Sequence, residues 1–160
     1  MSKKTEKTNV MRVLDQKNVA YNHYSFDSKS TSGAEVARSL GEDLHRVFKT
    51  LVTIGKSNEH YVFMVPIDQE LDLKKGAQAA KEKSIDMIPQ KALLPLTGYI
   101  HGGCSPIGMK KPFKTFIHES AETFTSIFFS AGKVGHQVEL SLSDLQQVIS
   151  VTTADLVKES

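Results

Sequence analysis

Two apolar runs separated by a short polar stretch constrain this chain more than any other feature. The segments "VFKTLVTI" (47–54) and "HYVFMVP" (60–66) consist mainly of large apolar and β-branched residues, and "GKSNE" (55–59) lies between them. Runs of this length and composition predict β-strands, and a short polar connection containing glycine predicts a hairpin. We therefore expect an antiparallel pair of strands near the middle of the chain.

One cation interrupts the first of these runs. With a period of two, Val47, Lys49 and Leu51 share one face of the strand, and both faces are largely apolar. Burying an unpaired ammonium is costly, and neither face offers this lysine an obvious route to water. Either Lys49 is an edge-strand residue whose stem reaches the surface, or an anionic or strongly dipolar group is meant to meet it.

The rest of the chain alternates between predicted helices and strands. Apolar periodicity and capping signals predict helices at about 5–17, 32–41, 71–83, 89–95 and 141–150, and strands at about 20–26, 85–88, 98–101, 114–118, 125–130 and 135–140. Ser32 and Glu35 form a capping-box pattern at the start of the second helix. The order and the hairpin connection predict a mixed α/β (α+β) domain with one central sheet, curled towards a barrel.

Length and composition indicate a globular protein of the cytoplasm. The 160 residues are 39% hydrophobic with a net charge of +2, and fit one domain over 1–160, with 1–7 as a flexible tail. No apolar run approaches the roughly 20 residues that span a bilayer, which predicts no membrane association. The start "MSKKTEKTNV" has no apolar segment typical of a secretory signal. A single cysteine, Cys104, fits a reducing compartment.

The lysines recur in small groups, although the net charge is low. These groups are Lys3/Lys4, Lys74/Lys75, Lys81/Lys83 and Lys110/Lys111/Lys114. If several of them converge in the fold, they can neutralise phosphates. The alternative is that each group is a solvated face of a surface helix or loop.

The segment "TGYIHGGCSPIGMKK" (97–111) is the densest glycine region of the chain. Glycines let the backbone approach a ligand closely, and successive free N–H groups form a cradle for an anion or a carbonyl. Neither GxxxxGK[ST] nor GxGxxG is present, which argues against a nucleotide-triphosphate or Rossmann site. A second glycine-containing turn lies in "SAGKVGHQVEL" (130–140). Both segments are also compatible with ordinary tight turns.

Cysteine and histidine give no strong catalytic or metal signature. Cys104 lies three residues after His101, but a catalytic thiol needs a lowered pKa, and a lone cysteine is more often a small buried side chain. The six histidines show no pair at the local spacing typical of metal sites, and CxxC, HExxH and GxSxG are absent. We expect no metal and no cofactor.

Taken together, five ordered motifs resemble the YbaK/EbsC family of free-standing Cys-tRNA(Pro) deacylases, which are related to the editing domain of bacterial prolyl-tRNA synthetases. The motifs are "NHYSFD", "RVFKTLV", "ELDLKK", "TGYIHGGCSPIGMKK" and "FFSAGKVGHQVEL", and the resemblance covers about residues 8–157. It implies a central, mixed and largely closed β-sheet flanked by helices.

The resemblance also assigns roles by position. Lys49 matches the family's essential lysine, and the residues that match its substrate pocket are Tyr24, Gly102, Gly103, Ser105, Pro106 and Gln137. Gln137 stands where relatives carry Asp or another small polar residue, and Cys104 occupies a variable position of the GG-x-SP loop. The candidate tRNA contacts are Lys74, Lys75, Lys110, Lys111 and Lys133.

The implied activity is removal of cysteine from tRNA(Pro), with Cys-tRNA(Cys) as an additional candidate substrate, by an enzyme acting in trans beside prolyl-tRNA synthetase. The cysteine thiol would attack its own ester carbonyl, so the enzyme would be a hydrolase, or a lyase if a thiolactone leaves. The alternatives are an Ala-tRNA(Pro) deacylase that activates water, a non-catalytic tRNA-binding module, and a thiol enzyme that uses Cys104.

Overall fold

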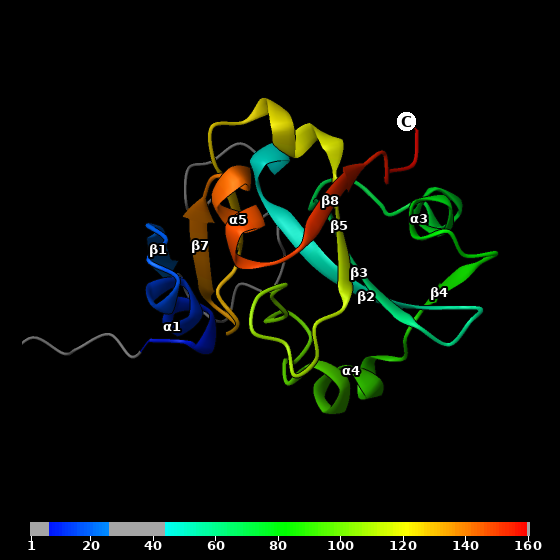
Figure 1. Cartoon of the computed structure of the whole chain (residues 1–160), viewed down its shortest axis with the longest axis horizontal. Helices are drawn as coiled ribbons and strands as arrows, with labels where there is room; N and C mark the ends of the chain where they lie inside the picture. The colour runs from blue at the N-terminus through cyan, green and yellow to red at the C-terminus, as the bar shows by residue number, and fades with distance from the viewer. Residues whose placement is uncertain (1–6, 26–43, 160) are drawn as a thin grey trace, which may run out of the picture.

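A computed structural model describes residues 7–25 and 44–159. The helix expected at 32–41 and nearly all of the expected tail at 1–7 lie outside these residues. Within them the predicted mixed α/β class is confirmed, but in place of the one central sheet that was expected there are two sheets, with helices around them (Figure 1). None of the helices in the described ranges has the length and hydropathy that crossing a bilayer requires.

The larger sheet is built on the predicted hairpin. Its strands, in spatial order, are β4 (Ile85–Met87), β2 (Phe48–Gly55), β3 (His60–Pro66), β5 (Lys114–His118) and β8 (Val151–Ala154). β2 and β3 pair antiparallel, with Lys49 opposite Val65, whereas β5 and β8 continue the sheet in parallel. β2 therefore lies between β4 and β3, but β4 pairs only with Thr53, Ile54 and Gly55, so at Lys49 the ladder partner of β2 is β3 alone.

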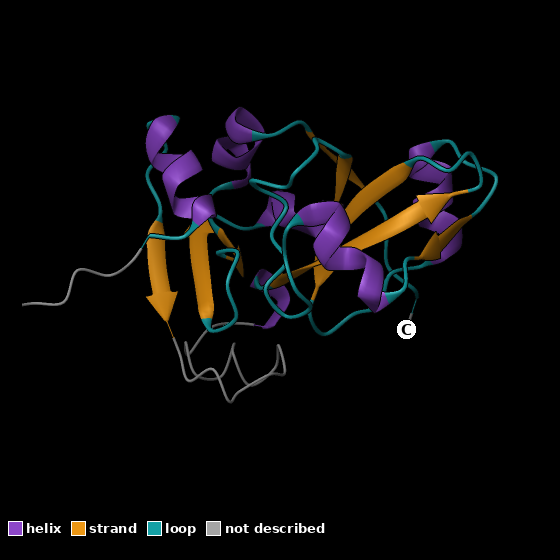
Figure 2. Ribbon diagram, turned by 90° about the horizontal axis from the view of Figure 1, so that it is seen from below, coloured by secondary structure: helices purple, strands orange, loops and turns teal. Residues whose placement is uncertain are grey.

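The smaller sheet has three strands. They are β1 (Asn22–Ser25), β7 (His136–Leu140) and β6 (Ile127–Ser130), and all their pairings are antiparallel. An isolated parallel bridge between Val47 and Phe128 joins this sheet to the start of β2. Figure 2 shows β1 and β7 beside one another and apart from the larger sheet. Lys49 follows this junction by two residues.

Four α-helices and two short 3-10 helices complete the described fold. These are α1 (Asn9–Gln16), η1 (Leu44–Arg46), α3 (Leu73–Ala80), α4 (Gln90–Thr97), η2 (Glu119–Thr123) and α5 (Leu142–Val148). The side chains of Thr8, Asp72 and Ser141 accept hydrogen bonds from backbone N–H groups at the starts of α1, α3 and α5. These caps explain why each helix begins where it does.

The core lies on both faces of the larger sheet. On one face, Val52, Val62 and Ile117 pack in a cluster that also contains apolar residues of α1, α5 and the smaller sheet. On the other face, α3 covers Phe63 and Phe116. The helix approaches so closely that a Cβ on its Gly76 would lie 2.7 Å from the Ile85 Cδ1 atom. This contact fixes α3 beside the face of β2 that carries Lys49.

Two sequence expectations need correction. The strand expected at 98–101 is wrong, because Gly98 ends α4 in a left-handed conformation (φ 88°) and the Tyr99 hydroxyl donates to the Ile107 carbonyl. Side-chain bonding holds this segment instead of a strand ladder. The final helix is shorter than expected, and β8, which follows it, was not predicted at all.

Candidate active site

Lys49 lies in a cavity at the start of β2. The cavity has a volume of about 660 Å³ and is lined by Lys49, Leu51, Glu70, Leu71, Asp72, Leu73, Lys74, Met87 and Lys158. We call it the Lys49 cavity. Its walls come from β2, from the segment leading into α3, from β4 and from the C-terminal segment. The motif around "ELDLKK" and the motif around "FKTL" therefore meet in one place.

The Lys49 side chain is half-buried and its ammonium is open to a ligand. Burial lowers the pKa of Lys49, while the nearby carboxylates of Glu70 and Asp68 act in the opposite direction. No hydrogen bond or ion pair engages its ammonium within residues 7–25 and 44–159. Glu70 instead pairs with Lys158, with 3.2 Å between Glu70 Oε2 and Lys158 Nζ. The Asp72 carboxylate accepts hydrogen bonds from the backbone N–H groups of Lys74 and Lys75.

Tyr24, Gln137 and Ser130 form a row across the smaller sheet. Tyr24 of β1 pairs with Gln137 of β7, and Gln137 pairs with Ser130 of β6. Directly paired residues of an antiparallel sheet project on the same face. The sheet thus brings together two predicted pocket residues and a serine that our assignment omitted. The signal for Ser130 was its place in the "SAGK" motif.

The junction between the sheets lies close to Lys49. Val47 bridges Phe128 in parallel, and Lys49 and Ser130 each follow this bridge by two residues. Val47 and Lys49 share a face of β2, and Val47 clusters with Phe128 and Tyr24. Tyr24, Ser130 and Gln137 do not line the Lys49 cavity, so the start of β2 is what connects the row to the cavity.

Gln137 carries a buried polar atom that has no partner in the described structure. Its side-chain Oε1 accepts no hydrogen bond there, although it is shielded from solvent. An unsatisfied buried acceptor costs on the order of 1–3 kcal/mol. A ligand with an N–H or O–H donor would recover that cost, so Gln137 is suited to bind a donor such as an amino group.

Tyr24 is held by a charged network centred on Glu139. The Glu139 carboxylate accepts from Tyr24 Oη at 2.9 Å, from Asn22 Nδ2 at 3.1 Å and from Ser126 Oγ at 2.5 Å, and it pairs with Arg46 Nη2 at 3.3 Å. Burial would raise the pKa of Glu139, but the hydrogen bonds and the Arg46 charge outweigh burial and lower it. Sequence reasoning missed this network.

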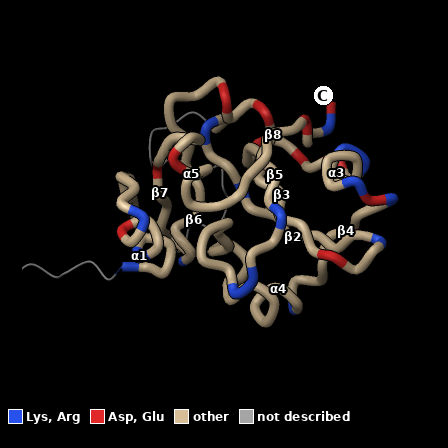
Figure 3. Tube along the Cα trace, viewed as in Figure 1, with Lys and Arg blue, Asp and Glu red and all other residues tan. Residues whose placement is uncertain are grey.

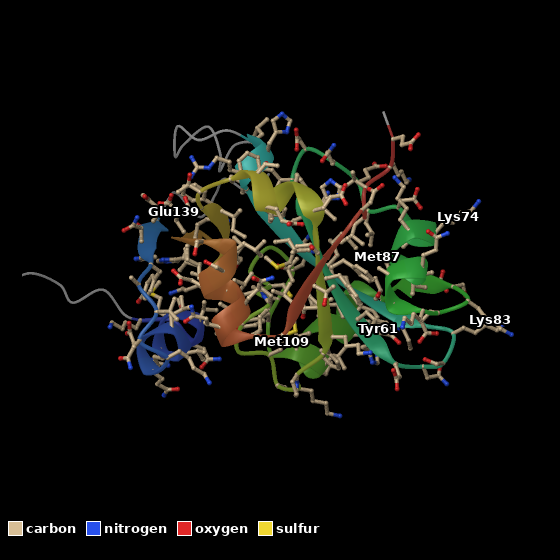
Figure 4. All side chains as sticks on the ribbon, turned by 45° about the horizontal axis from the view of Figure 1, so that its top comes forward. Tyr61, Lys74, Lys83, Met87, Met109 and Glu139 are labelled. Atoms are coloured by element: carbon tan, nitrogen blue, oxygen red, sulfur yellow. The ribbon has the colours of Figure 1, made fainter. Side chains whose placement is uncertain are left out.

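The positions of Glu139 and Arg46 in the sequence motifs could have indicated this network. Glu139 follows Gln137 by two residues on the same strand, and Arg46 stands directly before "VFKTL". Figure 4 shows Glu139 on the smaller sheet and Lys74 on α3 at opposite ends of the view.

The GG-x-SP loop lies against the second glycine turn. A Cβ on Gly103 would meet the Val134 backbone nitrogen at 3.0 Å, and Gly102 has a left-handed backbone (φ 86°). The backbone at Gly102 therefore favours glycine, and a side chain at position 103 would require the Val134 backbone to shift. The turn that Gly103 contacts connects Ser130 to Gln137, so the two glycine-containing segments form one unit beside the row of pocket residues.

Cys104, Ser105 and Pro106 of the loop are buried, and none of them has the environment of a reactive group. The Ser105 hydroxyl accepts from the Ile107 N–H at 3.4 Å, and Pro106 lines a different cavity, not that of Lys49. Burial raises the pKa of the Cys104 thiol to about 12, so it is not a ready nucleophile. Across 7–25 and 44–159, no group of three or more His, Cys, Asp or Glu side chains is arranged to hold a metal ion.

The lysines predicted to contact tRNA occupy different surroundings. Lys74 is exposed at the Lys49 cavity, and Lys133 is exposed in the turn beside Gly103. Lys75 is engaged instead with Asp155 at 3.0 Å and with the Val157 carbonyl. Lys110 and Lys111 are exposed beyond the loop, and only Lys111 lines a cavity. Lys75 is thus the least available of the set.

Comparison with known proteins identifies the fold and the family. The model of the aminoacyl-tRNA editing domain family matches residues 27–148. This chain belongs to the aminoacyl-tRNA editing domain family. Within that family, it is 49% identical over 142 residues to EbsC of Enterococcus faecalis, covering 87% of each chain. EbsC carries the provisional name of a Cys-tRNA(Pro)/Cys-tRNA(Cys) deacylase.

More distant comparisons add a further relative and two solved structures with the same fold. YwhH of Bacillus subtilis, an uncharacterized protein, is 25% identical over 122 residues, covering 76% of this chain and 77% of its own. A crystal structure assigned provisionally to a trans-editing enzyme for prolyl tRNA synthetase superposes with a TM-score of 0.86 at 20% identity, covering 94% of this chain and 96% of that one. The hypothetical protein APE2540 gives 0.87 at 18%, covering 94% and 100%. These two structures share the fold of the editing domain.

Proposed function

We propose that this chain deacylates Cys-tRNA(Pro), and that Cys-tRNA(Cys) is a second substrate. The observation that carries the proposal is the half-buried Lys49 ammonium, which no described side chain engages in a hydrogen bond or ion pair, in a cavity that begins two residues from the junction with the smaller sheet. Support for the substrate comes from the family and from the name of EbsC. A prolyl-tRNA synthetase is the partner that would release the mischarged tRNA, and we place the reaction in the cytoplasm.

The reaction breaks the ester between the cysteine carbonyl and the terminal ribose of the tRNA. In the proposed step the thiol sulfur bonds to the carbonyl carbon, the bond from that carbon to the ribose oxygen breaks, and the thiol proton ends on the ribose oxygen. The products are free tRNA and a cysteine thiolactone, which water then opens. Because nucleophile and carbonyl belong to one molecule, holding them in attack geometry supplies much of the rate increase.

Lys49 acts on the oxygen atoms of this ester. Its ammonium is a donor in a partly desolvated cavity, where charge-assisted hydrogen bonds are stronger than in water. Burial lowers the pKa of Lys49, which makes the ammonium a stronger hydrogen-bond donor to the leaving ribose oxygen, while the proton that this oxygen finally carries is the one from the thiol. In this role the protein needs neither a nucleophilic serine nor the inert Cys104 thiol.

The smaller sheet and the glycine loop hold the amino-acid end. The unpartnered Gln137 Oε1 accepts from the α-amino group of the substrate, and Tyr24, fixed by Glu139, closes the adjacent wall. The backbone of Gly102 and Gly103 approaches closely enough to contact a carbonyl without side-chain interference. This arrangement fixes the thiol relative to the carbonyl, which is the catalytic requirement.

A panel of charged tRNAs tests the proposal. Cys-, Ala-, Ser- and Pro-tRNA(Pro) and Cys-tRNA(Cys) are incubated with the protein and with Lys49→Ala, and release of the amino acid is followed. We expect rapid loss of cysteine and slow loss of serine, whose hydroxyl is a weaker nucleophile. Lys91→Ala, which removes an exposed lysine of α4, is the matched control.

Three other results of the tRNA panel would each contradict part of the proposal. Preferential Ala-tRNA(Pro) hydrolysis would replace the thiol mechanism by activated water. Tight tRNA binding with no deacylation of any member of the panel would make the chain a binding module. Full activity in a folded Lys49→Ala variant would remove Lys49 from the mechanism.

A further inference from the structure

A second cavity lies at the other end of α3 and takes no part in the proposed chemistry. It has a volume of about 590 Å³, and its lining is Ala79, Ala80, Lys81, Pro106, Gly108, Met109, Lys111, Pro112, Phe113, Lys114, Thr115, Phe116, Val148, Ile149, Ser150 and Thr152. We call it the basic cavity. It is formed by the C-terminal end of α3, the loop after the glycine region, the start of β5 and the connection from α5 to β8.

The charged residues in this lining all have the same sign. They are Lys81, Lys111 and Lys114, and no carboxylate lines the cavity. All three lysines are exposed, and none forms an ion pair with a carboxylate of the described residues. Elsewhere, segments carrying Lys or Arg and segments carrying Asp or Glu are interspersed (Figure 3). The convergence is therefore local, and it joins two lysine groups that are about 30 residues apart in the chain.

The floor of the basic cavity is apolar and includes an aromatic ring. Phe113 is half-buried and its ring lies 5.6 Å from that of His60 in a tilted arrangement. Phe116 and Met109 contribute further apolar surface. An aromatic ring surrounded by lysines is the combination that binds single-stranded nucleic acid, because the base stacks on the ring and the cations meet the phosphates.

The basic cavity is within reach of a ligand that occupies the Lys49 cavity. Lys74 lines the Lys49 cavity and Ala80 lines the basic cavity, and both belong to α3. Six residues of helix correspond to a rise of about 9 Å. Pro106 of the GG-x-SP loop also faces the basic cavity, so the loop has one end at the pocket residues and the other at the lysines.

We infer that the basic cavity binds a nucleotide of the single-stranded 3′ end of the tRNA, upstream of the charged terminal nucleotide. Its base rests on Phe113, and Lys81, Lys111 and Lys114 neutralise three successive phosphates around it. The inference rests on the proposed function for the identity of the RNA. The basic cavity holds the single-stranded 3′ end of the tRNA in place, and this positions the terminal ester at Lys49.

The test removes the three charges and measures binding of uncharged tRNA(Pro). The variant Lys81→Gln/Lys111→Gln/Lys114→Gln keeps unbranched side chains, so the left-handed backbone at Lys81 (φ 59°) is no more strained than before. The matched control, Arg12→Gln/Lys17→Gln/Lys91→Gln, removes the same charge at exposed positions outside both cavities. Thermal melting verifies that both variants fold.

We expect the cavity variant to raise the Kd on the order of 30-fold at about 0.15 M salt, and the control far less. The slope of log Kd against log salt should decrease by about 2, as expected for three phosphate contacts on a single strand. Phe113→Leu should raise the Kd about fivefold or more without changing that slope. In deacylation, the cavity variant should lose more in kcat/KM than in kcat.

A tRNA truncated before its single-stranded 3′ end distinguishes the sources of the effect. The inference predicts that the cavity variant and the native protein bind this RNA equally. An equal loss of affinity for the intact and the truncated tRNA would show that the three lysines contact the double-stranded part of the tRNA, and this would overturn the inference. The inference would also be overturned if the cavity variant bound intact tRNA as tightly as the control variant. Binding of polyglutamate to the native protein but not to the cavity variant would then indicate that the cavity binds an acidic protein.

Binding of uncharged tRNA does not depend on catalysis. If the tRNA panel shows no deacylation but the cavity variant loses affinity for the intact 3′ end, the proposed function fails and the inference stands. If deacylation is rapid and the affinity is unchanged, only the inference fails.

Discussion

The two cavities flank the same helix but differ in how their charges are arranged. The Lys49 cavity contains three lysines and two carboxylates, whereas the basic cavity contains three lysines and no carboxylate. In the Lys49 cavity Glu70 pairs with Lys158 and Asp72 caps α3. These partners leave Lys49 as the half-buried cation with no direct partner among the described residues.

The two charge arrangements suit two different purposes, chemistry and binding. A single desolvated ammonium at a fixed point suits chemistry, because its effect depends on position to within a fraction of an ångström. Several solvated lysines around an apolar floor suit binding of a polyanion, because their effects add over distance and tolerate movement. The predictions below test whether the two cavities are independent in this way.

The largest effect is expected when both cavities are changed together. Lys49→Ala should reduce deacylation by about 10²–10³-fold, mainly in kcat, as is typical of losing one stabilising donor. Combined with the three lysine changes of the basic cavity, the fold losses in kcat/KM should multiply to within about twofold, since separate sites act additively. Single-turnover and steady-state kinetics of the four proteins measure this. A combined loss far smaller than the product would show that the cavities act as one site.

A smaller effect is expected from Glu139→Gln, which should affect deacylation at the Lys49 cavity but not tRNA binding at the basic cavity. The pKa of Glu139 is lowered in the folded protein, so its contribution to stability is present above the ordinary pKa of about 4.5 and is lost as the pH falls through the folded value. We expect the variant to be less stable by about 1–3 kcal/mol at neutral pH. The difference should shrink in acid.

Urea unfolding of both proteins at neutral and acidic pH measures this. Because Tyr24 loses an anchor, deacylation should fall, while the Kd for uncharged tRNA should not change. An equal stability loss at every pH would contradict a role for the Glu139 charge.

The smallest effect is expected from Cys104→Ala. The thiol is buried and its pKa is raised to about 12, so we expect deacylation and tRNA affinity to stay within about twofold of the native protein. Kinetics before and after treatment with iodoacetamide give an independent measurement. Abolished activity in a folded variant would revive the thiol-enzyme alternative and end the assignment of chemistry to Lys49.

Local patterning was sufficient for the elements whose partners are close in the chain. The hairpin was predicted within a residue of β2 and β3, and β5 was predicted at 114–118, where it is found. These strands are apolar runs bounded by turn residues, so their period and length identify them. The motif order also identified the family correctly.

Elements that depend on distant partners were harder to predict. β8 is four residues long and exists because it pairs in parallel with β5, about 35 residues earlier in the chain. The segment 98–101 has strand-like composition, but Tyr99 bonds to the Ile107 carbonyl and the strand does not form. Similarly, the Glu139 network joins β1, η1 and β7, and no local pattern contains all three.

The residues around Lys49 are enough to predict a cation in an apolar strand, because period and composition are local properties of the chain. Which groups meet there, and which lysines converge elsewhere, depends on the tertiary fold. Long-range pairing of β-strands brings Tyr24, Gln137 and Ser130 into one row, and the packing of α3 on the sheet brings Lys81 to Lys111 and Lys114. Such contacts depend on how surfaces far apart in the chain fit together, which no short segment specifies.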